Sequence, residues 1–487
     1  MMALMRPAQP RTHAHLPADG LFVPLVADVR GRRRSAVGLV REALDRIDAA
    51  RDLNAVIRLR AEAALAEAQA IDDRIRSAPE TLGPLAGLPM LVKDIEDVAG
   101  LPTTYGSLLY ADAPPAAHDG LVPRRLRAAG AIVVGKTNTP EFAWTSWTAN
   151  RLFGATRNPW APAFSPGGSS GGSSAALSAG LVPIATATDG GGSIRIPASL
   201  TGLIGIKPTN GVIARETFPS WIDLSTDGPM ATTVADLALL LELEAGPDVG
   251  DPIAQQLWRL GPWQRPARVY AARRLAGDHP LDPVVETMYA RALTAIEADL
   301  GLPVELVEHA QIFPSGVDPL AWFPVGGPEH AHAIGRETIE RHGDQMDPGL
   351  RRWLEAGLDV SMTDHQAGRR LRHRYTAELE AFLAGDAVLV TPTLAVPGWS
   401  PDGVRAGAAE PGLPLWAFNT EHLNLTGHPA MALPAGRFED GAATGLPFGI
   451  QVIGPRFREG LLFGFAAAWE EARPWPLVAD GYRVFGS

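Results

Sequence analysis

Cysteine is absent from this chain of 487 residues. Its absence excludes disulfide bonds, thiol catalysis, cysteine-ligated zinc and iron–sulfur clusters. Lysine is almost absent as well: of the 43 lysines and arginines, only Lys93, Lys136 and Lys207 are lysine. A buried lysine can lose its proton, whereas an arginine effectively cannot. The composition therefore suggests that one of the three lysines serves as a base.

Net positive charge and long apolar runs are also lacking. The net charge of −11 argues against a surface for nucleic acid or anionic membranes. The one basic cluster, Arg30–Arg34, is interpreted as solvated chain before a helix. No apolar run approaches the roughly 20 residues of a membrane-spanning helix. The start of the chain has no signal-peptide core. We expect a soluble cytoplasmic protein that binds neither nucleic acid nor membranes.

Short apolar runs broken by glycine and proline alternate with helical patterns along the chain. Strands are predicted at 88–92, 131–135, 181–188, 202–209, 386–393 and 448–454, and helices at 35–50, 62–75, 124–130, 231–245 and 460–472. The alternation predicts an α/β fold, a single large α/β/α domain with a central mixed sheet covered by helices. Residues 1–30 are predicted to form an N-terminal arm, and 31–487 the domain. A mainly helical insertion is expected at about 255–385, and a loop-rich stretch at 426–448.

Two short motifs match known patterns but lack the required context. Gly130–Thr137 has the letters of a phosphate-binding loop, yet its middle residues are typical of a buried strand, and Pro140 follows where a helix should form. Nucleotide binding is therefore the least favoured hypothesis, and Lys136 is interpreted as structural or as part of a pocket wall. Gly167–Gly171 fits the G-x-S-x-G nucleophile elbow, but prolines precede it where a strand is needed.

The histidines give no metal motif. H-E-x-x-H does not occur, and His330 and His332 are expected on a solvated helix. His422 and His428 stay open as partners of a serine nucleophile in a hydrolase triad. The sequence therefore predicts neither a metal ion nor a cofactor.

The segment Ser165–Pro208 carries the strongest functional signal. It contains a Gly/Ser-rich turn, a helix of small residues, a strand, and then Asp189 followed by three glycines and Ser193. Three glycines before a serine allow backbone N–H groups to turn inward at close range, as an oxyanion hole requires. The apolar sequence ALSAGLVPIATAT inside the segment is typical of a packed core and argues against a flexible linker. We therefore interpret the segment as an active site.

With these residues in view, the sequence resembles the amidase signature family of serine amide hydrolases. The segment above is similar to the Gly/Ser-rich signature of that family. Further matching motifs follow the family order across roughly residues 35–475: GLPMLVKD, GKTNTPEFA, FGATRNP, DGPMATTVADLALLL, LVTPT, NLTGHPAMALPAG and LPFGIQVIG. The resemblance covers most of the chain, and the motifs together are highly specific.

The resemblance implies a Ser–Ser–Lys triad. Ser193 matches the nucleophile, Ser169 the bridging serine that follows a cis peptide bond, and Lys93 the base. The N–H groups that match the oxyanion hole belong to Gly190, Gly191, Gly192 and Ser193. The chemistry of the residues agrees, because a serine hydroxyl needs a base at neutral pH. Lys93 follows an apolar run, so burial is expected to lower its pKa and leave it neutral.

Other residues are expected to support this loop. Asp189 and Arg195 match supporting residues of the family, while Ser170, Ser173 and Thr188 are interpreted as a hydrogen-bonding scaffold. The commonest family form has threonine where Gly190 stands. We therefore expect a wider or looser wall beside the oxyanion hole.

Aromatic residues are candidates for an apolar substrate pocket. Phe142, Trp144 and Trp147 lie in or directly after the GKTNTPEFA motif. Others occur in stretches that look irregular: Phe218, Trp221, Trp322 and Trp416. For each of these side chains taken alone, packing in the core is the competing role.

The function implied by the resemblance is hydrolysis of carboxamide-type C–N bonds through an acyl-enzyme on Ser193. The substrate would be a small-molecule amide, anilide or carbamate, and a carbamate would make the enzyme a urethanase. The alternative is the amidase (glutaminase) subunit of a tRNA-dependent amidotransferase complex, which the acidic charge favours less. No cofactor is implied, and a homodimer is left open.

Overall fold

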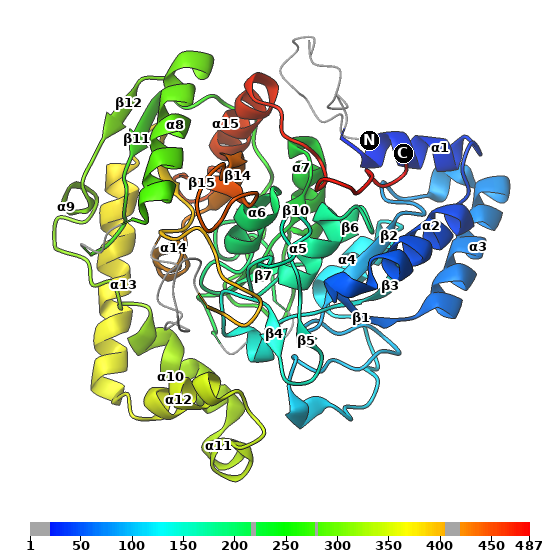
Figure 1. The fold of residues 1–487 in the computed structure, drawn as a ribbon, viewed down its shortest axis with the longest axis horizontal. Helices are drawn as coiled ribbons and strands as arrows, with labels where there is room; N and C mark the ends of the chain where they lie inside the picture. Colours follow the sequence, from blue (N-terminus) through cyan, green and yellow to red (C-terminus); the bar gives the residue numbers. More distant parts are fainter. Residues whose placement is uncertain (1–19, 216–220, 278–280, 405–418) are drawn as a thin grey trace.

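The apolar runs of the sequence form the strands of a central mixed sheet in the computed structural model, which describes residues 20–215, 221–277, 281–404 and 419–487. Four strands pair in the order β1-β3-β2-β6, and seven pair in the order β10-β8-β14-β15-β13-β11-β12. β6 and β10 lie next to each other, so both groups belong to one layer (Figure 1). Parallel and antiparallel pairs both occur, for example β2 with β3 and β14 with β15. The predicted α/β fold with a mixed sheet is confirmed.

Each of the six predicted strand ranges overlaps an observed strand, but the sequence did not predict the other strands of the two groups. The smaller group consists of β1 (Val56–Leu59), β3 (Ile132–Thr137), β2 (Pro89–Lys93) and β6 (Ile184–Ala185). The larger group consists of β10 (Met230–Ala231), β8 (Ile204–Lys207), β14 (Ala430–Arg437), β15 (Pro447–Ile453), β13 (Ala387–Pro392), β11 (Arg268–Ala271) and β12 (Val304–Leu306). Separate two-stranded pairs are β4 (Ala149–Asn150) with β5 (Gly154–Ala155), and β7 (Thr188–Asp189) with β9 (Thr226–Asp227).

The N-terminal helices are α1 (Phe22–Arg30), α2 (Ala36–Ala49), α3 (Ala61–Ser77) and α4 (Leu121–Ala128). Ser35 caps α2 by accepting a hydrogen bond from the Gly38 N–H, which explains why this helix begins where the sequence predicts. The prediction of an N-terminal arm over 1–30 is wrong for α1, because its apolar face is buried in the core. Residues 1–19 lie outside the described part.

Two short helices, α5 (Gly171–Ser178) and α6 (Arg195–Thr201), are buried at every residue. Glycines on the sheet let α6 lie close to it. A Cβ atom at Gly205 would stand 2.9 Å from Ala198 Cβ, and one at Gly449 would stand 2.6 Å from Ser199 Oγ. These helices carry the glycine- and serine-rich segment into the interior of the protein.

The remaining helices around the sheet are α7 (Val234–Glu244), α8 (Pro283–Leu300), α14 (Glu421–Thr426) and α15 (Glu459–Ala472). Single 3₁₀ turns occur at η1 (Arg51–Leu53), η2 (Pro79–Thr81), η3 (Leu108–Tyr110) and η4 (Glu141–Ala143). Thr233 caps α7 by accepting a hydrogen bond from the Asp236 N–H.

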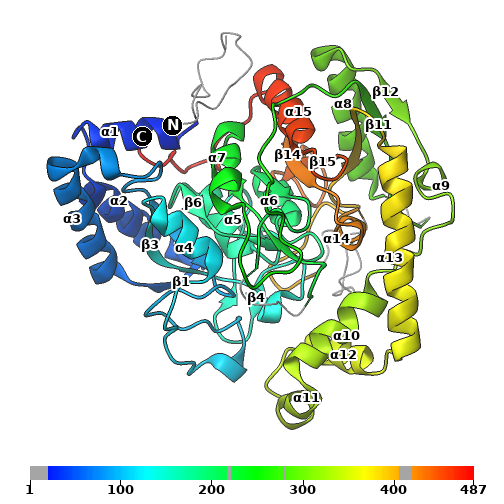
Figure 2. The same ribbon diagram turned by 180° about the vertical axis from the view of Figure 1, so that it is seen from behind.

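The region 255–385 is only partly the helical insertion that the sequence predicts. Its strands β11 and β12 pair in parallel fashion with each other, and β11 pairs with β13, so they extend the central sheet. The helices after them are α9 (His309–Ile312), α10 (Phe323–Ile334), α11 (Arg336–His342), α12 (Pro348–Leu358) and α13 (Met362–Phe382). Figures 1 and 2 show α10–α12 as a group at one end of the long helix α13.

Two further sequence predictions need correction. The stretch 426–448, expected to be loop-rich, contains the eight-residue strand β14 between β8 and β15. His330, expected on a solvated helix, lies on α10 with a fully buried side chain, although His332 is exposed.

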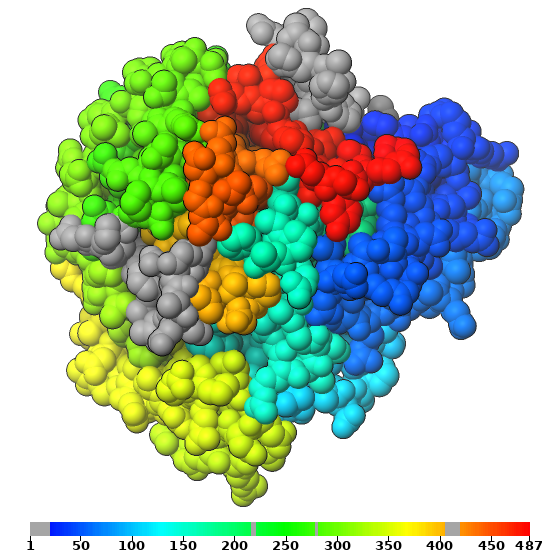
Figure 3. Space-filling model, in the orientation of Figure 1, coloured from blue at the N-terminus to red at the C-terminus, as the bar shows by residue number. Residues whose placement is uncertain are grey.

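The two ends of the described chain lie side by side. The space-filling view in Figure 3 shows the C-terminal segment packed on the N-terminal helices. Arg46 on α2 donates hydrogen bonds to the carbonyl groups of Arg483 (2.6 Å) and Val484 (3.1 Å). In the described ranges, no helix is both long and apolar enough to cross a membrane.

Candidate active site

Lys93 is the last residue of β2, and its side chain is fully buried. Its Nζ lies 2.7 Å from Ser169 Oγ, 2.9 Å from Ser170 Oγ and 2.9 Å from Thr188 Oγ1. Burial lowers the pKa of Lys93 to about 7, against the opposing effect of Glu96, Asp189 and Asp227. A large fraction of Lys93 is therefore neutral at neutral pH, as a base requires.

The two serines beside Lys93 precede helix α5. The Gly168–Ser169 peptide bond is cis, as the resemblance implies. Thr139 Oγ1 donates to the Ser169 carbonyl at 3.0 Å, and the Ser170 N–H donates to the Ser193 carbonyl at 3.3 Å. The backbone around Ser193 is thus held against the two serines that contact Lys93.

Asp189 anchors the loop that carries Ser193. Its carboxylate accepts hydrogen bonds from the N–H groups of Gly192 (2.7 Å) and Ile194 (3.1 Å). The Arg195 guanidinium meets the same carboxylate through two contacts of 2.9 Å, and both side chains are fully buried. Although burial alone would raise the pKa of Asp189, Arg195 holds it well below its ordinary value. The pair is therefore a buried ionic anchor rather than a surface ion pair.

The expected set of oxyanion donors changes in one member. The Gly192 N–H is already bonded to Asp189, so it is not free to bind an oxyanion. The backbone at Gly192 has a φ of +130°, and a Cβ there would stand 2.4 Å from Thr420 Oγ1, so only glycine fits. The N–H groups of Gly190, Gly191 and Ser193 have no acceptor within the described residues. They remain available as donors.

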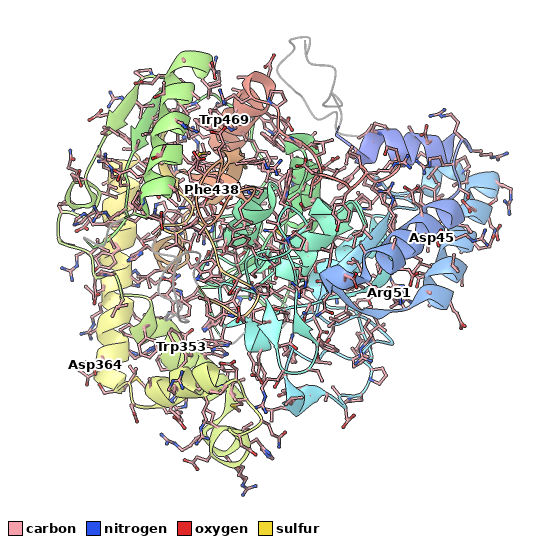
Figure 4. The ribbon with its side chains drawn as sticks, viewed as in Figure 1. Asp45, Arg51, Trp353, Asp364, Phe438 and Trp469 are labelled. Carbon is pink, nitrogen blue, oxygen red and sulfur yellow. The ribbon has the colours of Figure 1, made fainter. Side chains whose placement is uncertain are left out.

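A cavity with tryptophan walls opens at Ser193, and we refer to it as the tryptophan cavity. Its described lining residues are Ala143, Trp144, Thr145, Ser146, Gly191, Ser193, Ile196, Trp221, Pro319, Leu320, Trp322, Phe323, Trp353 and Glu421. Trp353 comes from α12, beside α10 in Figure 4. Ser193 is 8% exposed and borders this space, whereas Lys93 is inaccessible to solvent.

The wall beside Gly190 is filled, which corrects the expectation of a looser wall. A Cβ at Gly190 would stand 2.4 Å from Cε3 of Trp221 and 2.7 Å from its Cζ3. The Trp322 indole N–H donates to the Gly190 carbonyl at 3.0 Å, and the two indole rings meet edge to face at 5.5 Å. The absence of a side chain at Gly190 therefore makes room for Trp221.

Of the seven aromatic candidates, Trp144, Trp221 and Trp322 line the tryptophan cavity, whereas Phe142 and Trp147 do not. Phe142 stacks on Tyr105 at 5.9 Å in a separate cluster. Trp147 packs against Trp399 at 6.3 Å. Phe218 and Trp416 lie outside the described residues.

The alternatives considered from the sequence acquire other roles in the structure. Lys136 lies in strand β3 rather than in a phosphate-binding loop, and pairs with Asp94 at 3.2 Å. His428 pairs with Glu380 at 3.0 Å, and His422 contacts the Asp318 carbonyl at 3.1 Å. Within the described ranges, no group of three or more histidine, aspartate or glutamate side chains is placed to hold a metal ion.

Sequence reasoning missed a group of polar residues from the C-terminal third. Asn424 Nδ2 donates to Asp189 Oδ1 at 2.9 Å, and Arg195 donates to Gln451 Oε1 at 2.7 Å and to the Thr420 carbonyl at 2.9 Å. Glu421, next in the chain, lines the tryptophan cavity. Asn424 and Gln451 stand inside motifs that match the family, and this position in a motif is the sequence signal that could have marked them as site residues. Glu421 gives none.

The chain is similar to known proteins over most of its length. The family model named Amidase matches residues 38–463. The chain is 33% identical over 467 residues to an acylamidase of Rhodococcus erythropolis, covering 93% of this chain and 95% of the relative. It is 35% identical over 480 residues to a glutamyl-tRNA(Gln) amidotransferase subunit of a Cyanothece species, covering 91% and 96%. The solved structure of a bacterial aryl acylamidase, an amidase signature enzyme, superposes with a TM-score of 0.83 at 29% identity, covering 92% of this chain and 95% of that one.

Proposed function

Because this chain belongs to the amidase family and is an amide hydrolase, we propose that Ser193 is its nucleophile, Lys93 its base and Ser169 the bridge between them. The contacts of Lys93 carry the proposal. Its buried Nζ lies 2.7 Å from Ser169 Oγ and is surrounded by hydroxyl groups rather than by a carboxylate. A carboxylate partner would favour the protonated lysine, whereas hydroxyl groups allow proton transfer in both directions.

The reaction then proceeds in two halves. Ser193 Oγ bonds to the substrate carbonyl carbon, while its proton passes through the Ser169 hydroxyl to neutral Lys93. The N–H groups of Gly190, Gly191 and Ser193 stabilise the oxyanion. When the C–N bond breaks, the proton returns through Ser169 to the leaving nitrogen. Water then attacks the acyl carbon while its proton passes through Ser169 to Lys93, and as the bond from that carbon to Ser193 Oγ breaks, the proton returns through Ser169 to Ser193 and the acid leaves.

The tryptophan cavity supports a bulky apolar or aryl group on the substrate. Its lining includes four indole rings and the ring of Phe323, which offer large flat contact surfaces for such groups. One of the similar solved structures is named an aryl acylamidase, and that name contains an aryl group. We propose that the substrates are amides or anilides with an aromatic or bulky apolar substituent, and that carbamates of the same shape react as well.

A covalent probe and an active-site variant test this proposal. A sulfonyl fluoride or phosphonate should label the wild-type chain on Ser193, as located by mass spectrometry of the modified peptide. Ser193→Ala should remain folded, as judged by thermal unfolding, and should lose hydrolysis of a chromogenic 4-nitroanilide. A label on another residue, or normal turnover by Ser193→Ala, would refute the assignment.

The second candidate is the amidase subunit of an ammonia-transferring complex. The similarity to an amidotransferase subunit over nearly the whole chain favours it. Glutaminase activity that appears only after addition of a partner subunit would support this role. Hydrolysis of simple anilides by the isolated chain would support the first candidate.

A further inference from the structure

The walls of the tryptophan cavity are joined to one another through ring contacts. Trp221 meets Trp322 edge to face at 5.5 Å, and Trp322 lies 6.1 Å from Trp353. Behind Trp221, the ring of His330 approaches it to 4.9 Å and is fully buried. Because each ring is supported by the next, the cavity presents a largely preformed aromatic surface.

Glu421 is the carboxyl group among the described lining residues of this cavity. It is the first residue of α14, and Thr420 before it is held by hydrogen bonds through both its carbonyl and its hydroxyl group. The Thr420 carbonyl accepts from Arg195 at 2.9 Å, and Thr420 Oγ1 donates to the Gly191 carbonyl at 2.7 Å. A Cβ built at Gly191 would stand 3.5 Å from Glu421 Cγ. The Glu421 side chain therefore lies directly beside the proposed oxyanion loop.

The carboxyl of Glu421 has no hydrogen-bond donor or ion-pair partner within the described residues. The cation that acts on it is Arg195, whose guanidinium is already bonded to Asp189, Asn424 and Gln451. Burial raises the pKa of Glu421 to about 8, which favours the neutral acid at neutral pH. A charged carboxylate at this place needs a counter-ion, and the protein supplies none from the described ranges.

We propose that Glu421 and the tryptophan walls form a subsite for a positively charged ammonium group of the amide substrate, close to the scissile bond. The inference rests on the proposed function, since it names the substrate class of that same site. An ammonium ion would gain from the Glu421 carboxylate and from the faces of the indole rings together. A neutral N–H donor would gain one hydrogen bond and little from the rings. The cation is therefore the occupant that uses both features of the cavity.

Matched substrates in which an ammonium group replaces a methyl group test this subsite. On the acyl side the pair is 3-aminopropanoyl 4-nitroanilide and butanoyl 4-nitroanilide. On the leaving-group side it is the acetamide of 4-(aminomethyl)aniline and that of 4-ethylaniline. For at least one pair, wild-type kcat/KM should favour the ammonium member by about tenfold or more, as a partly buried charge pair provides. In Glu421→Gln, which keeps the shape but not the charge, that ratio should fall by about tenfold.

Glu340→Gln is the control variant, because Glu340 is 64% exposed on α11. It should keep the wild-type ratio. If the neutral members are hydrolysed and Glu421→Gln changes neither ratio, the subsite proposal is overturned while the proposed function stands. Binding of both pairs to Ser193→Ala by calorimetry gives the same comparison without turnover. Tighter, Glu421-dependent binding of an ammonium member supports the subsite even if hydrolysis fails, and equal binding of both members overturns it.

Discussion

Lys93 and Lys136 lie on neighbouring parallel strands, one position apart in register, and their surroundings differ completely. The register pairs Val92 with Lys136 and Lys93 with Thr137, so the two lysines point to opposite faces of the sheet. Both side chains are fully buried, and burial lowers the pKa of each. Lys93 faces three hydroxyl groups. Lys136 faces the Asp94 carboxylate at 3.2 Å and the Glu96 carbonyl at 2.6 Å.

The difference shows that burial alone does not make a lysine a base. Lys207 makes the same point, because burial lowers its pKa to about 7 as well, yet it contacts only the Pro208 carbonyl and the Asn210 side chain among the described residues. What separates Lys93 from both is the set of three hydroxyl groups around its Nζ, those of Ser169, Ser170 and Thr188. A proton can leave Lys93 toward a hydroxyl group, whereas Lys136 holds its proton against a carboxylate.

The largest effect is expected from Lys93→Met. Removal of the proposed base should lower kcat/KM for a 4-nitroanilide by about 1,000-fold or more, because the serine hydroxyl is then not activated. The hydroxyl groups around it each lose one partner, so a moderate loss of stability is expected, but the fold should persist. Steady-state kinetics and thermal unfolding measure both effects. Activity within tenfold of the wild type would contradict the assignment of Lys93.

Lys136→Met should have the opposite effect, a large loss of stability with little change in kcat/KM. It leaves the buried Asp94 carboxylate without its cation, which typically costs about 3–5 kcal/mol of unfolding free energy. The folded fraction should keep kcat/KM close to the wild type. Urea unfolding and active-site titration measure the two quantities.

The double variant Lys136→Met/Asp94→Asn serves as its control, because the unpaired charge is removed. It should recover part of the lost stability. A folded Lys136→Met protein without activity would show that the two lysines act together.

The site can be predicted from the sequence where its residues stand in contiguous motifs. Lys93, Ser169, Ser193 and Asp189 are located in this way, and the structure brings the first two into contact. Apolar runs near these residues in sequence also predict β2, β3 and β8, because a fully buried strand is apolar on both faces.

The parts that could not be predicted depend on contacts between distant residues. β14 contains Pro434 and Gly436, which look like loop residues in sequence, yet it pairs with β15 over most of its length and with β8 at its start. Trp221 fills the space beside Gly190 through a contact between two residues that are far apart in the sequence. Glu421 enters the cavity through a short helix whose sequence gives no sign of a binding role.

The pH dependence of activity gives the third test of the comparison. Lys93 must be neutral to accept the serine proton, and burial lowers its pKa to about 7. Below that pH the protonated fraction grows, so kcat/KM should fall by up to about tenfold per pH unit, and above it kcat/KM should level off. Lys136→Met should show the same midpoint. A midpoint above about pH 9, near the value of an exposed lysine, would contradict the role of Lys93.

The smallest effect is expected when one hydroxyl group beside Lys93 or beside Lys136 is removed. Thr188 Oγ1 lies 2.9 Å from Lys93 Nζ, and Thr103 Oγ1 lies 3.1 Å from Lys136 Nζ; both threonines are 7% exposed. Valine preserves the shape of either side chain and removes its hydroxyl. One such hydrogen bond contributes about 1 kcal/mol, so Thr188→Val should lower kcat/KM several-fold by loosening the position of Nζ. Thr103→Val should change unfolding free energy by a similar amount and leave kcat/KM unaltered. Equal losses of kcat/KM in the two variants would mean that the hydroxyl groups around Lys93 are scaffold only.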